Sequence, residues 1–257
     1  MPKVFVHGNP ETSALWRPLF DELKGLGVND LTAVSPPGFG SPVPEGFEPT
    51  QVGYRDWLIE QLENLGGDVD LVGHDWGAGH VYGLLAERPH LLRSWAADCA
   101  GLVHREYVWH DAAQAWQTPE VGEQAIAAMF GMSVEERIAT WAGLGIREDI
   151  AQEIASEQDE EMGRCVLTLY RSAAQPAMSE LGQRLCGTTQ RPGLVIIATE
   201  DFYTGTPEMC ASVADDLGAG TLTLEGLGHW WMFEAARTAA DALVAHWDSA
   251  GQLGAPG

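Results

Sequence analysis

Short apolar runs and longer amphipathic segments alternate along the first hundred residues of the chain. Short, mostly apolar runs predict strands at residues 4–6, 31–35, 69–72 and 93–99. Segments with helical spacing of apolar positions predict helices at 13–24, 52–65 and 78–88. This alternation predicts a parallel sheet with helices on both of its faces.

The alternation stops after residue 102 and returns near residue 190. Between them the pattern contains no convincing strand and predicts helices at 119–129, 134–144, 147–157 and 160–173. Strands are expected again at 194–198 and 221–224, with helices at 207–217 and 233–247. We therefore predict an α/β core made of residues 1–102 and 188–257, with a helical cap inserted at 103–187.

Residues 73–77, Gly-His-Asp-Trp-Gly, lie between a predicted strand and a predicted helix. They have the form of a nucleophile elbow in which Asp75 stands where the usual motif carries serine. A carboxylate can displace a leaving group from a saturated carbon, and the resulting ester can then be hydrolysed at its own carbonyl. The alternative is that Asp75 only shapes a turn, since Asp and Gly are frequent in loops for conformational reasons.

A histidine and an acid follow the elbow in the order that a triad on this scaffold requires. His229 comes directly after the predicted strand 221–224, and glycines before it allow a bent loop. Glu200 and Asp201 both end the apolar run from residue 194. Since consecutive residues at a strand end point in opposite directions, one of the two can orient the imidazole, and we favour Asp201.

The first predicted strand ends in His-Gly-Asn-Pro at residues 7–10. An oxyanion loop is expected at this place, ahead of the nucleophile. The backbone N–H groups of Asn9 and Trp76 would then converge on the carbonyl oxygen of an Asp75 ester when water attacks it. The same residues also suit an ordinary turn, and the two interpretations are compatible.

These segments, with Pro-Gly-Phe-Gly at 37–40 and Gly-His-Trp at 228–230, resemble the α/β-hydrolases of the branch that contains epoxide hydrolases and haloalkane dehalogenases. The resemblance covers nearly the whole chain. It implies an α/β-hydrolase fold, which is a mostly parallel, doubly wound sheet with an inserted helical cap, and it places the acid at Asp201. Because Val4 already matches the strand before the oxyanion loop, we expect a shorter sheet than the family's.

Two features favour the epoxide side of this branch. Tyr170, in Leu-Tyr-Arg at 169–171, resembles the cap tyrosine that protonates the epoxide oxygen, and Trp230 follows the histidine as it does in epoxide hydrolases. The alternative for Tyr170 is a packing role on an amphipathic helix. Tyr107 is a weaker candidate for the second cap tyrosine that such enzymes carry.

Two other features favour the haloalkane dehalogenases. There the departing halide is held by the side chains of a Trp after the nucleophile and of an Asn in the His-Gly-Asn-Pro loop, which Trp76 and Asn9 match. We favour epoxide hydrolysis by a small margin, with haloalkane dehalogenation as the alternative. A non-catalytic ligand-binding member of the fold is the third hypothesis.

Ten tryptophans in 257 residues indicate an aromatic, apolar cleft. We expect Phe39, Trp109, Trp116 and Trp230 to line it and to bind a neutral hydrophobic small molecule. The formal net charge of −23, with 14 Lys and Arg, argues against nucleic acid and anionic membranes as partners.

The remaining expectations concern cofactors and location. The four cysteines lack a CxxC spacing, so we expect neither a disulfide nor a metal site, and the predicted chemistry needs no cofactor. The sequence shows no secretory leader and no apolar run of about 18 residues, which makes the cytoplasm the expected location. The pattern does not indicate an oligomeric state.

Overall fold

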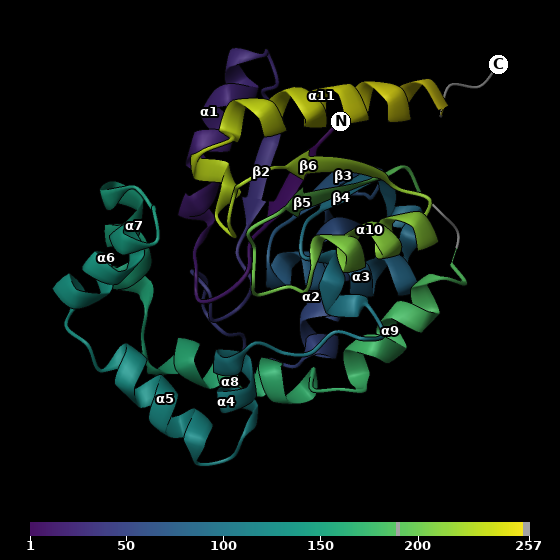
Figure 1. Ribbon diagram of the computed structural model, residues 1–257. Helices are drawn as coiled ribbons and strands as arrows, with labels where there is room; N and C mark the ends of the chain where they lie inside the picture. Colours follow the sequence, from purple (N-terminus) through teal and green to yellow (C-terminus); the bar gives the residue numbers. More distant parts are fainter. Residues whose placement is uncertain (189–190, 254–257) are drawn as a thin grey trace.

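The computed structural model describes residues 1–188 and 191–253, and a parallel sheet lies at its centre (Figure 1). The six strands have the order β2-β1-β3-β4-β5-β6. Their bounds are Lys3–Val6 (β1), Leu31–Val34 (β2), Val69–Gly73 (β3), Leu92–Ala97 (β4), Gly193–Ala198 (β5) and Gly220–Leu224 (β6). Every pairing is parallel, which confirms the predicted sheet.

The register brings the carboxyl ends of the central strands to one edge. Val6 pairs with Gly73, and Gly73 pairs with Ala97. The loops that follow β1, β3 and β4 therefore begin side by side. Ligand sites of parallel sheets form at this edge.

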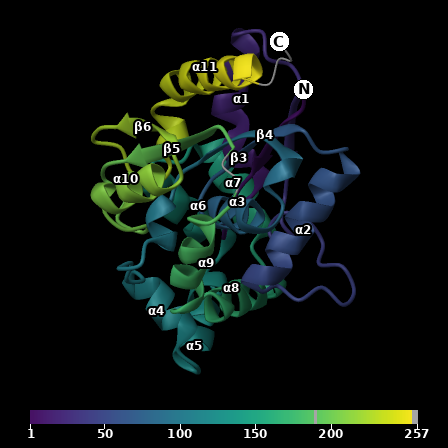
Figure 2. The ribbon, with the colours of Figure 1, turned by 90° about the vertical axis from the view of Figure 1, so that its right-hand side faces the viewer.

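Helices cover both faces of the sheet (Figures 1 and 2). α1 (Arg17–Gly25) and α11 (Ala236–Leu253) lie on one face, and α2 (Gln51–Asn64), α3 (Trp76–Glu87) and α10 (Pro207–Asp216) lie on the other. Because side chains alternate along a strand, Phe5 packs into the core under α1 and α11, whereas Val4 and Val6 pack into the core under α2 and α3. Both faces are thus buried, as the apolar strands predict.

Helices also fill the segment between β4 and β5, and we refer to this segment as the cap. These are α4 (Asp111–Gln117), α5 (Val121–Phe130), α6 (Val134–Gly143), α7 (Glu148–Glu157), α8 (Glu160–Ser172) and α9 (Ala177–Leu185). The sequence pattern predicted α5 to α8, and it missed α4 and α9, which have seven and nine residues and so leave little periodicity to detect. The start of α6 is fixed by a capping box in which Ser133 and Glu136 bond each other's backbone N–H groups.

Short 3-10 turns join several of these elements. They are η1 (Ser13–Trp16), η2 (Pro89–Leu91), η3 (Ala100–Val103) and η4 (Trp231–Phe233). The predicted single helix at 13–24 is therefore η1 followed by α1. Pro18, near the start of α1, has no N–H to continue a hydrogen-bonded helix across this point. Within the described part of the chain, no helix is long and apolar enough to cross a membrane.

Candidate active site

Asp75 occupies the sharp turn between β3 and α3. Its backbone lies at φ 53° and ψ −123°, a conformation that is strained for a residue with a side chain. The turn fits only because two neighbours are glycines: a Cβ on Gly77 would collide with the Val6 carbonyl, and one on Gly8 would collide with the Asp75 carboxylate. The backbone N–H of Asp75 donates to Asp98 Oδ1 at 3.0 Å. This geometry is that of a nucleophile elbow.

His229 lies between Asp75 and Asp201. Its Nδ1 is 2.8 Å from Asp201 Oδ2, and its Nε2 is 3.6 Å from Asp75 Oδ2. Asp201 also accepts from the Tyr203 N–H at 2.9 Å, which holds the carboxylate in place. The neighbouring Glu200 is exposed, so the structure brings Asp201 rather than Glu200 to the imidazole. The three side chains form the arrangement of a catalytic triad.

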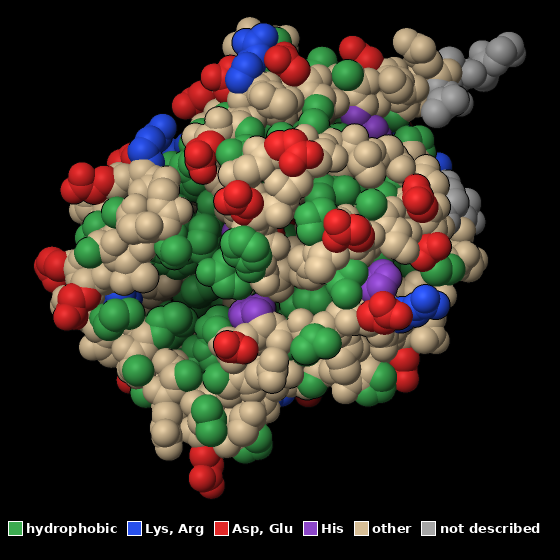
Figure 3. Space-filling view, viewed as in Figure 1, with side chains coloured by type: hydrophobic (Ala, Val, Ile, Leu, Met, Phe, Trp, Pro, Cys, Tyr) green, Lys and Arg blue, Asp and Glu red, His purple; other side chains and the backbone are tan. Residues whose placement is uncertain are grey.

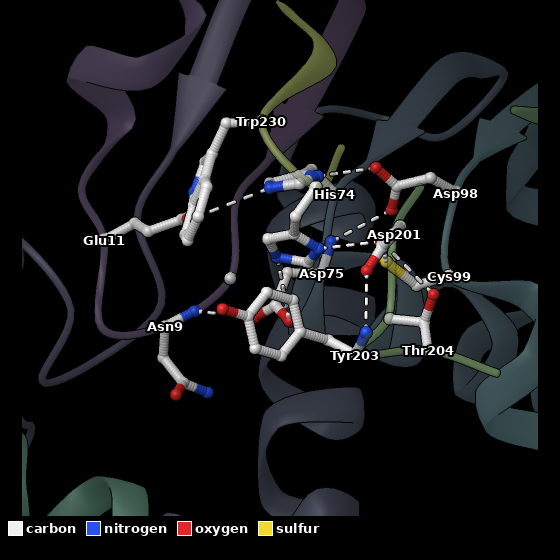
Figure 4. A network of polar contacts seen from close by, with 12 residues as sticks. Asn9, Glu11, His74, Asp75, Asp98, Cys99, Asp201, Tyr203, Thr204 and Trp230 are labelled. Carbon is white, nitrogen blue, oxygen red and sulfur yellow. Dashed lines mark hydrogen bonds and ion pairs between the residues drawn. The ribbon is translucent and has the colours of Figure 1, made fainter. Parts of the chain in front are cut away.

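The loop after β1 supplies a hydrogen-bond donor to the Asp75 carboxylate. The Asn9 N–H donates to Asp75 Oδ1 at 3.0 Å, which places this oxygen in an oxyanion site (Figure 4). The Asn9 side chain is 7% exposed, and among the described residues neither atom of its amide finds a hydrogen-bond partner. Trp76, the other predicted donor, begins α3 and is buried, but no hydrogen bond from its backbone to the Asp75 carboxylate is seen within the described residues. The site therefore offers Asp75 one clear backbone donor and an amide that is free to bind something else.

Burial and neighbouring charges shift the pKa values of Asp75 and His229. Burial raises the pKa of Asp75 to about 6, although the His229 charge opposes this rise. For His229 burial disfavours the charged form, but the Asp201 carboxylate more than offsets it and raises the pKa of the imidazole to about 9. The two groups therefore form a buried ion pair between these values, with Asp75 as a carboxylate that can attack.

A cavity of about 210 Å³ opens in front of Asp75. Figure 3 shows the hollow between the α6–α7 region and the rest of the molecule, with mostly hydrophobic side chains around it. The described residues that line it are Asn9, Pro10, Asp75, His110, Ala112, Trp116, Met129, Met132, Arg137, Thr140, Trp141, Leu144, Gln158, Tyr170, Tyr203, His229 and Trp230. An apolar wall with a few polar groups is typical of a small-molecule site.

The predicted wall residues divide into two groups. Trp116 and Trp230 line the cavity, as does Tyr170. Phe39 and Trp109 do not line it: Phe39 packs in the core at 5.8 Å from the ring of Tyr54, and Trp109 stacks on Trp76 at 5.9 Å. Both are large and apolar, and the sequence gives no sign that they face the core rather than the cleft.

Tyr170 lies within a cage of indoles. Its ring is 4.7 Å from Trp116, 5.4 Å from Trp76 and 5.5 Å from Trp109. Burial raises the pKa of its hydroxyl well above the ordinary value, so that the group stays protonated. The hydroxyl of Tyr107 is already engaged, since it donates to the Tyr203 carbonyl at 2.6 Å. Of the two cap tyrosines that the sequence suggested, only Tyr170 lies on the cavity wall.

A family model described as the alpha/beta hydrolase family matches residues 4–242. The chain belongs to this family. Two curated relatives are haloalkane dehalogenases: one from Mycolicibacterium smegmatis is 38% identical over 111 residues, and one from Sphingobium indicum is 36% identical over 88 residues. These matches cover 41% and 30% of this chain but only 33% and 27% of the relatives.

Solved structures agree with the fold. A loop variant of the haloalkane dehalogenase DbeA from Bradyrhizobium elkanii superposes with a TM-score of 0.73 at 20% sequence identity, over 96% of this chain and 90% of that one. At this level of identity the similarity establishes the shared α/β-hydrolase fold and not a shared reaction.

A second group of buried charges lies behind the triad of this α/β-hydrolase. His74 Nδ1 is 2.5 Å from Asp98 Oδ2, and its Nε2 is 3.6 Å from Glu11 Oε1 (Figure 4). Trp231 also donates to Asp98, at 2.8 Å, and Trp230 donates to Glu11. The His74 and His229 rings are 4.7 Å apart. The structure thus joins the elbow, the oxyanion loop and the base through one buried network.

The opposite charges in this network stabilise one another's ionised forms. Burial opposes ionisation of His74, but Asp98 and Glu11 on its two sides raise its pKa well above the ordinary value. Burial would also raise the pKa of Asp98, yet His74 holds it below the usual carboxyl range. Sequence reasoning missed Glu11 and Asp98. Asp98 follows β4 at the edge where the other site residues lie, and this position was the available signal.

Three sets of described side chains have ligand atoms within 4.8 Å of one another. They are Glu11, His74 and His229; His74, Asp98 and Cys99; and Cys99, Asp201 and His229. Most of these groups already bond each other, as His74 does with Asp98 and His229 does with Asp201. The arrangement therefore suits proton transfer at His229, and the sequence-based expectation that the site uses no metal or cofactor stays a prediction.

Proposed function

We propose that this α/β-hydrolase is a haloalkane dehalogenase that forms an alkyl ester on Asp75. The observation that carries the proposal is the Asn9 amide, which is buried, unpaired and on the cavity wall beside Asp75. A buried amide without a partner is costly unless a ligand satisfies it. A departing halide needs N–H donors and no proton, and Asn9 Nδ2 supplies such a donor. The two dehalogenase relatives support the same choice.

In the first step Asp75 Oδ2 attacks the carbon that bears the halogen. Its partner Oδ1 is held by the Asn9 N–H, which leaves Oδ2 beside His229 as the oxygen free to react. The new C–O bond forms as the carbon–halogen bond breaks, and the halide leaves with the bonding electrons toward the Asn9 amide. Trp76 does not line the cavity, so we assign the first halide contact to Asn9.

In the second step His229 Nε2 takes a proton from water, and the water oxygen attacks the carbonyl carbon of the ester. Negative charge develops on the oxygen that the Asn9 N–H contacts. Collapse of this intermediate releases the alkoxide, which leaves as an alcohol with the proton from His229. Asp75 is then a carboxylic acid, and it gives the second proton of the water to His229, which restores the ion pair. Asp201 stabilises the imidazolium during this step.

Alkylation also prepares the base for its role. The Asp75 charge is one of the factors that raise the pKa of His229. Ester formation removes this charge, so the imidazole loses its proton more readily once the ester exists. The imidazolium gives its proton to solvent, which is the proton that the net reaction releases with the halide, and a neutral ester then lies beside a neutral imidazole base.

Epoxide hydrolysis, which the sequence alone favoured, is the second candidate. Tyr170 supports it, because the residue lies on the cavity wall and burial keeps its hydroxyl protonated. An epoxide oxygen must receive a proton or strong hydrogen bond as the ring opens, and Tyr170 would donate it. The haloalkane reaction ranks first because the two relatives described above are haloalkane dehalogenases and because the Asn9 amide can donate directly to a halide.

Turnover of 1-bromohexane and 1,2-epoxyhexane by the purified protein tests the choice, with Asp75→Ala as the blank. We expect bromide release and no diol. Formation of diol without bromide would support epoxide hydrolysis instead. The Tyr170→Phe variant should then form no diol. Silence on both substrates, with no covalent adduct on Asp75, would favour the non-catalytic hypothesis.

A further inference from the structure

The cavity wall holds a cation that no described carboxylate neutralises. Arg137, on α6, lines the cavity and is 9% exposed, and in the described chain it is the one buried Lys or Arg. Among the described Asp and Glu residues, none lies within 4.0 Å of it. Buried arginines are ordinarily paired. The exception therefore needs a physical reason.

Backbone contacts explain only part of this position. Arg137 Nη1 donates to the carbonyls of Phe130 at 2.9 Å and Met132 at 3.3 Å, where α5 ends. A cation at the carboxyl end of a helix interacts favourably with the helix dipole, but these carbonyls supply only partial charges and not the full negative charge that a buried guanidinium ordinarily pairs with. The Nε atom of Arg137 is buried and has no hydrogen-bond partner among the described residues. The positive charge and one donor are thus left over on a wall that includes Met129 and Trp141.

We propose that Arg137 forms a subsite for an anion, so that the substrate is an alkyl halide whose chain ends in a carboxylate. The proposal rests on the dehalogenation proposed above and names its substrate class. Asp75 lies on the core wall and Arg137 on the cap wall of one cavity, and apolar side chains provide most of the remaining lining. A substrate with a reactive carbon at one end, an apolar chain and an anion at the other end matches this distribution.

This substrate differs from the neutral molecule that the composition predicts. A net charge of −23 repels anions at long range, but solvent ions screen that field over about 10 Å. A buried guanidinium is screened much less and binds a carboxylate through charge-assisted hydrogen bonds. Local attraction therefore decides the specificity of the cavity.

Binding of hexanoate and hexanamide, measured by calorimetry on the whole protein, tests the subsite without turnover. We expect hexanoate to bind about 10- to 100-fold more tightly. Arg137→Gln retains an N–H donor for the carbonyls and loses the charge, so it should abolish the preference. The matched control is Arg164→Gln on α8, which removes an exposed guanidinium that pairs with Glu161 and should leave the preference intact.

Turnover of 6-bromohexanoate and 6-bromohexanamide separates an anion subsite from a structural role. We expect Arg137→Gln to lower kcat/KM for the carboxylate about 10- to 100-fold and to leave the amide within a few-fold. Equal losses for both substrates would overturn the subsite, as would equal binding of hexanoate and hexanamide by the unmodified protein. The comparison of hexanoate with hexanamide uses the unmodified protein, so it tests the anion subsite even if Arg137→Gln does not fold.

The same data distinguish failure of this subsite from failure of the proposed function. Bromide release from the amide without any preference for the carboxylate would overturn the subsite and leave dehalogenation standing. A strong preference for hexanoate without any bromide release would support the subsite and overturn dehalogenation.

Discussion

The two walls of the cavity are built in different ways. The core wall carries Asn9, Asp75 and His229, which follow parallel strands and are joined by hydrogen bonds and an ion pair. The cap wall consists mostly of helical side chains such as Met129 and Trp141, which fill space without bonding the triad. Methionine is flexible and adapts to differently shaped partners. This difference supports the proposal that the core wall carries the chemistry and that the cap wall selects the substrate.

The largest effect on kcat is expected when Asp201, the acid on the core wall, is replaced. Asp201→Asn should lower kcat for every substrate by about 10⁴-fold, because the amide favours the wrong tautomer of His229 and cannot stabilise its charge. Steady-state bromide release measures the effect. Glu200→Gln, a change in the exposed neighbour, is the matched control and should retain activity. The reverse result would show that the acid is assigned to the wrong residue.

A smaller loss is expected when only the halide contact is removed. Asn9→Ala keeps the backbone N–H that contacts Asp75 but deletes the amide, so it should slow alkylation about 10²-fold. Single-turnover bromide release isolates this step, and Asn29→Ala on the exposed surface is the control. An unchanged alkylation rate would remove Asn9 from the halide site.

The pH dependence of the core wall follows from Asp75. Only the carboxylate attacks, and its pKa is about 6, so the alkylation rate should fall about tenfold for each pH unit below that value. Because the His229 charge lowers this pKa, His229→Gln should move the acid limb to higher pH. Single-turnover rates between about pH 4.5 and 8 record both effects. A rate that stays flat to the acid end contradicts the burial of a titrating nucleophile.

The smallest effect on rate is expected from the cap wall. Trp141 packs against Trp230 at 5.7 Å and lines the cavity. Trp141→Ala should enlarge the site, raise KM several-fold for short bromoalkanes and spare longer ones, with kcat nearly constant. Val134→Ala, at an exposed position of the same helix, is the control. If Trp141→Ala lowers kcat equally for all chain lengths, the two walls are not separate in function.

The sequence predicted the core wall more fully than the cap wall. Asp75, Asp201 and His229 follow strands, and the carboxyl ends of parallel strands meet at one edge, so local motifs were enough to place them together. Local motifs were not enough to place Glu11 and Asp98 in the site, because the sequence around an acidic loop residue shows neither whether the side chain is buried nor which residue it contacts.

The cap shows a different limit. Helical periodicity predicted α5 to α8, but an apolar helix face can turn to the core, the cavity or another helix. Trp109 and Phe39 lie in loops, where no periodicity indicates which way a side chain faces, and they were expected on the wall but lie in the core. Arg137, on α6, was not foreseen on the wall. Such assignments depend on how helices pack, which the spacing of residues does not specify.

The most direct test is covalent trapping of the Asp75 ester. His229→Gln is incubated with 1-bromohexane at about pH 8.5, where Asp75 is ionised, and the protein is analysed by intact and peptide mass spectrometry. We expect one hexyl group per chain, on the peptide that contains Asp75, and none in the Asp75→Ala/His229→Gln double variant. A His229→Gln protein without an adduct, while the wild type releases bromide, would contradict nucleophilic attack by Asp75, as would an adduct on any other residue.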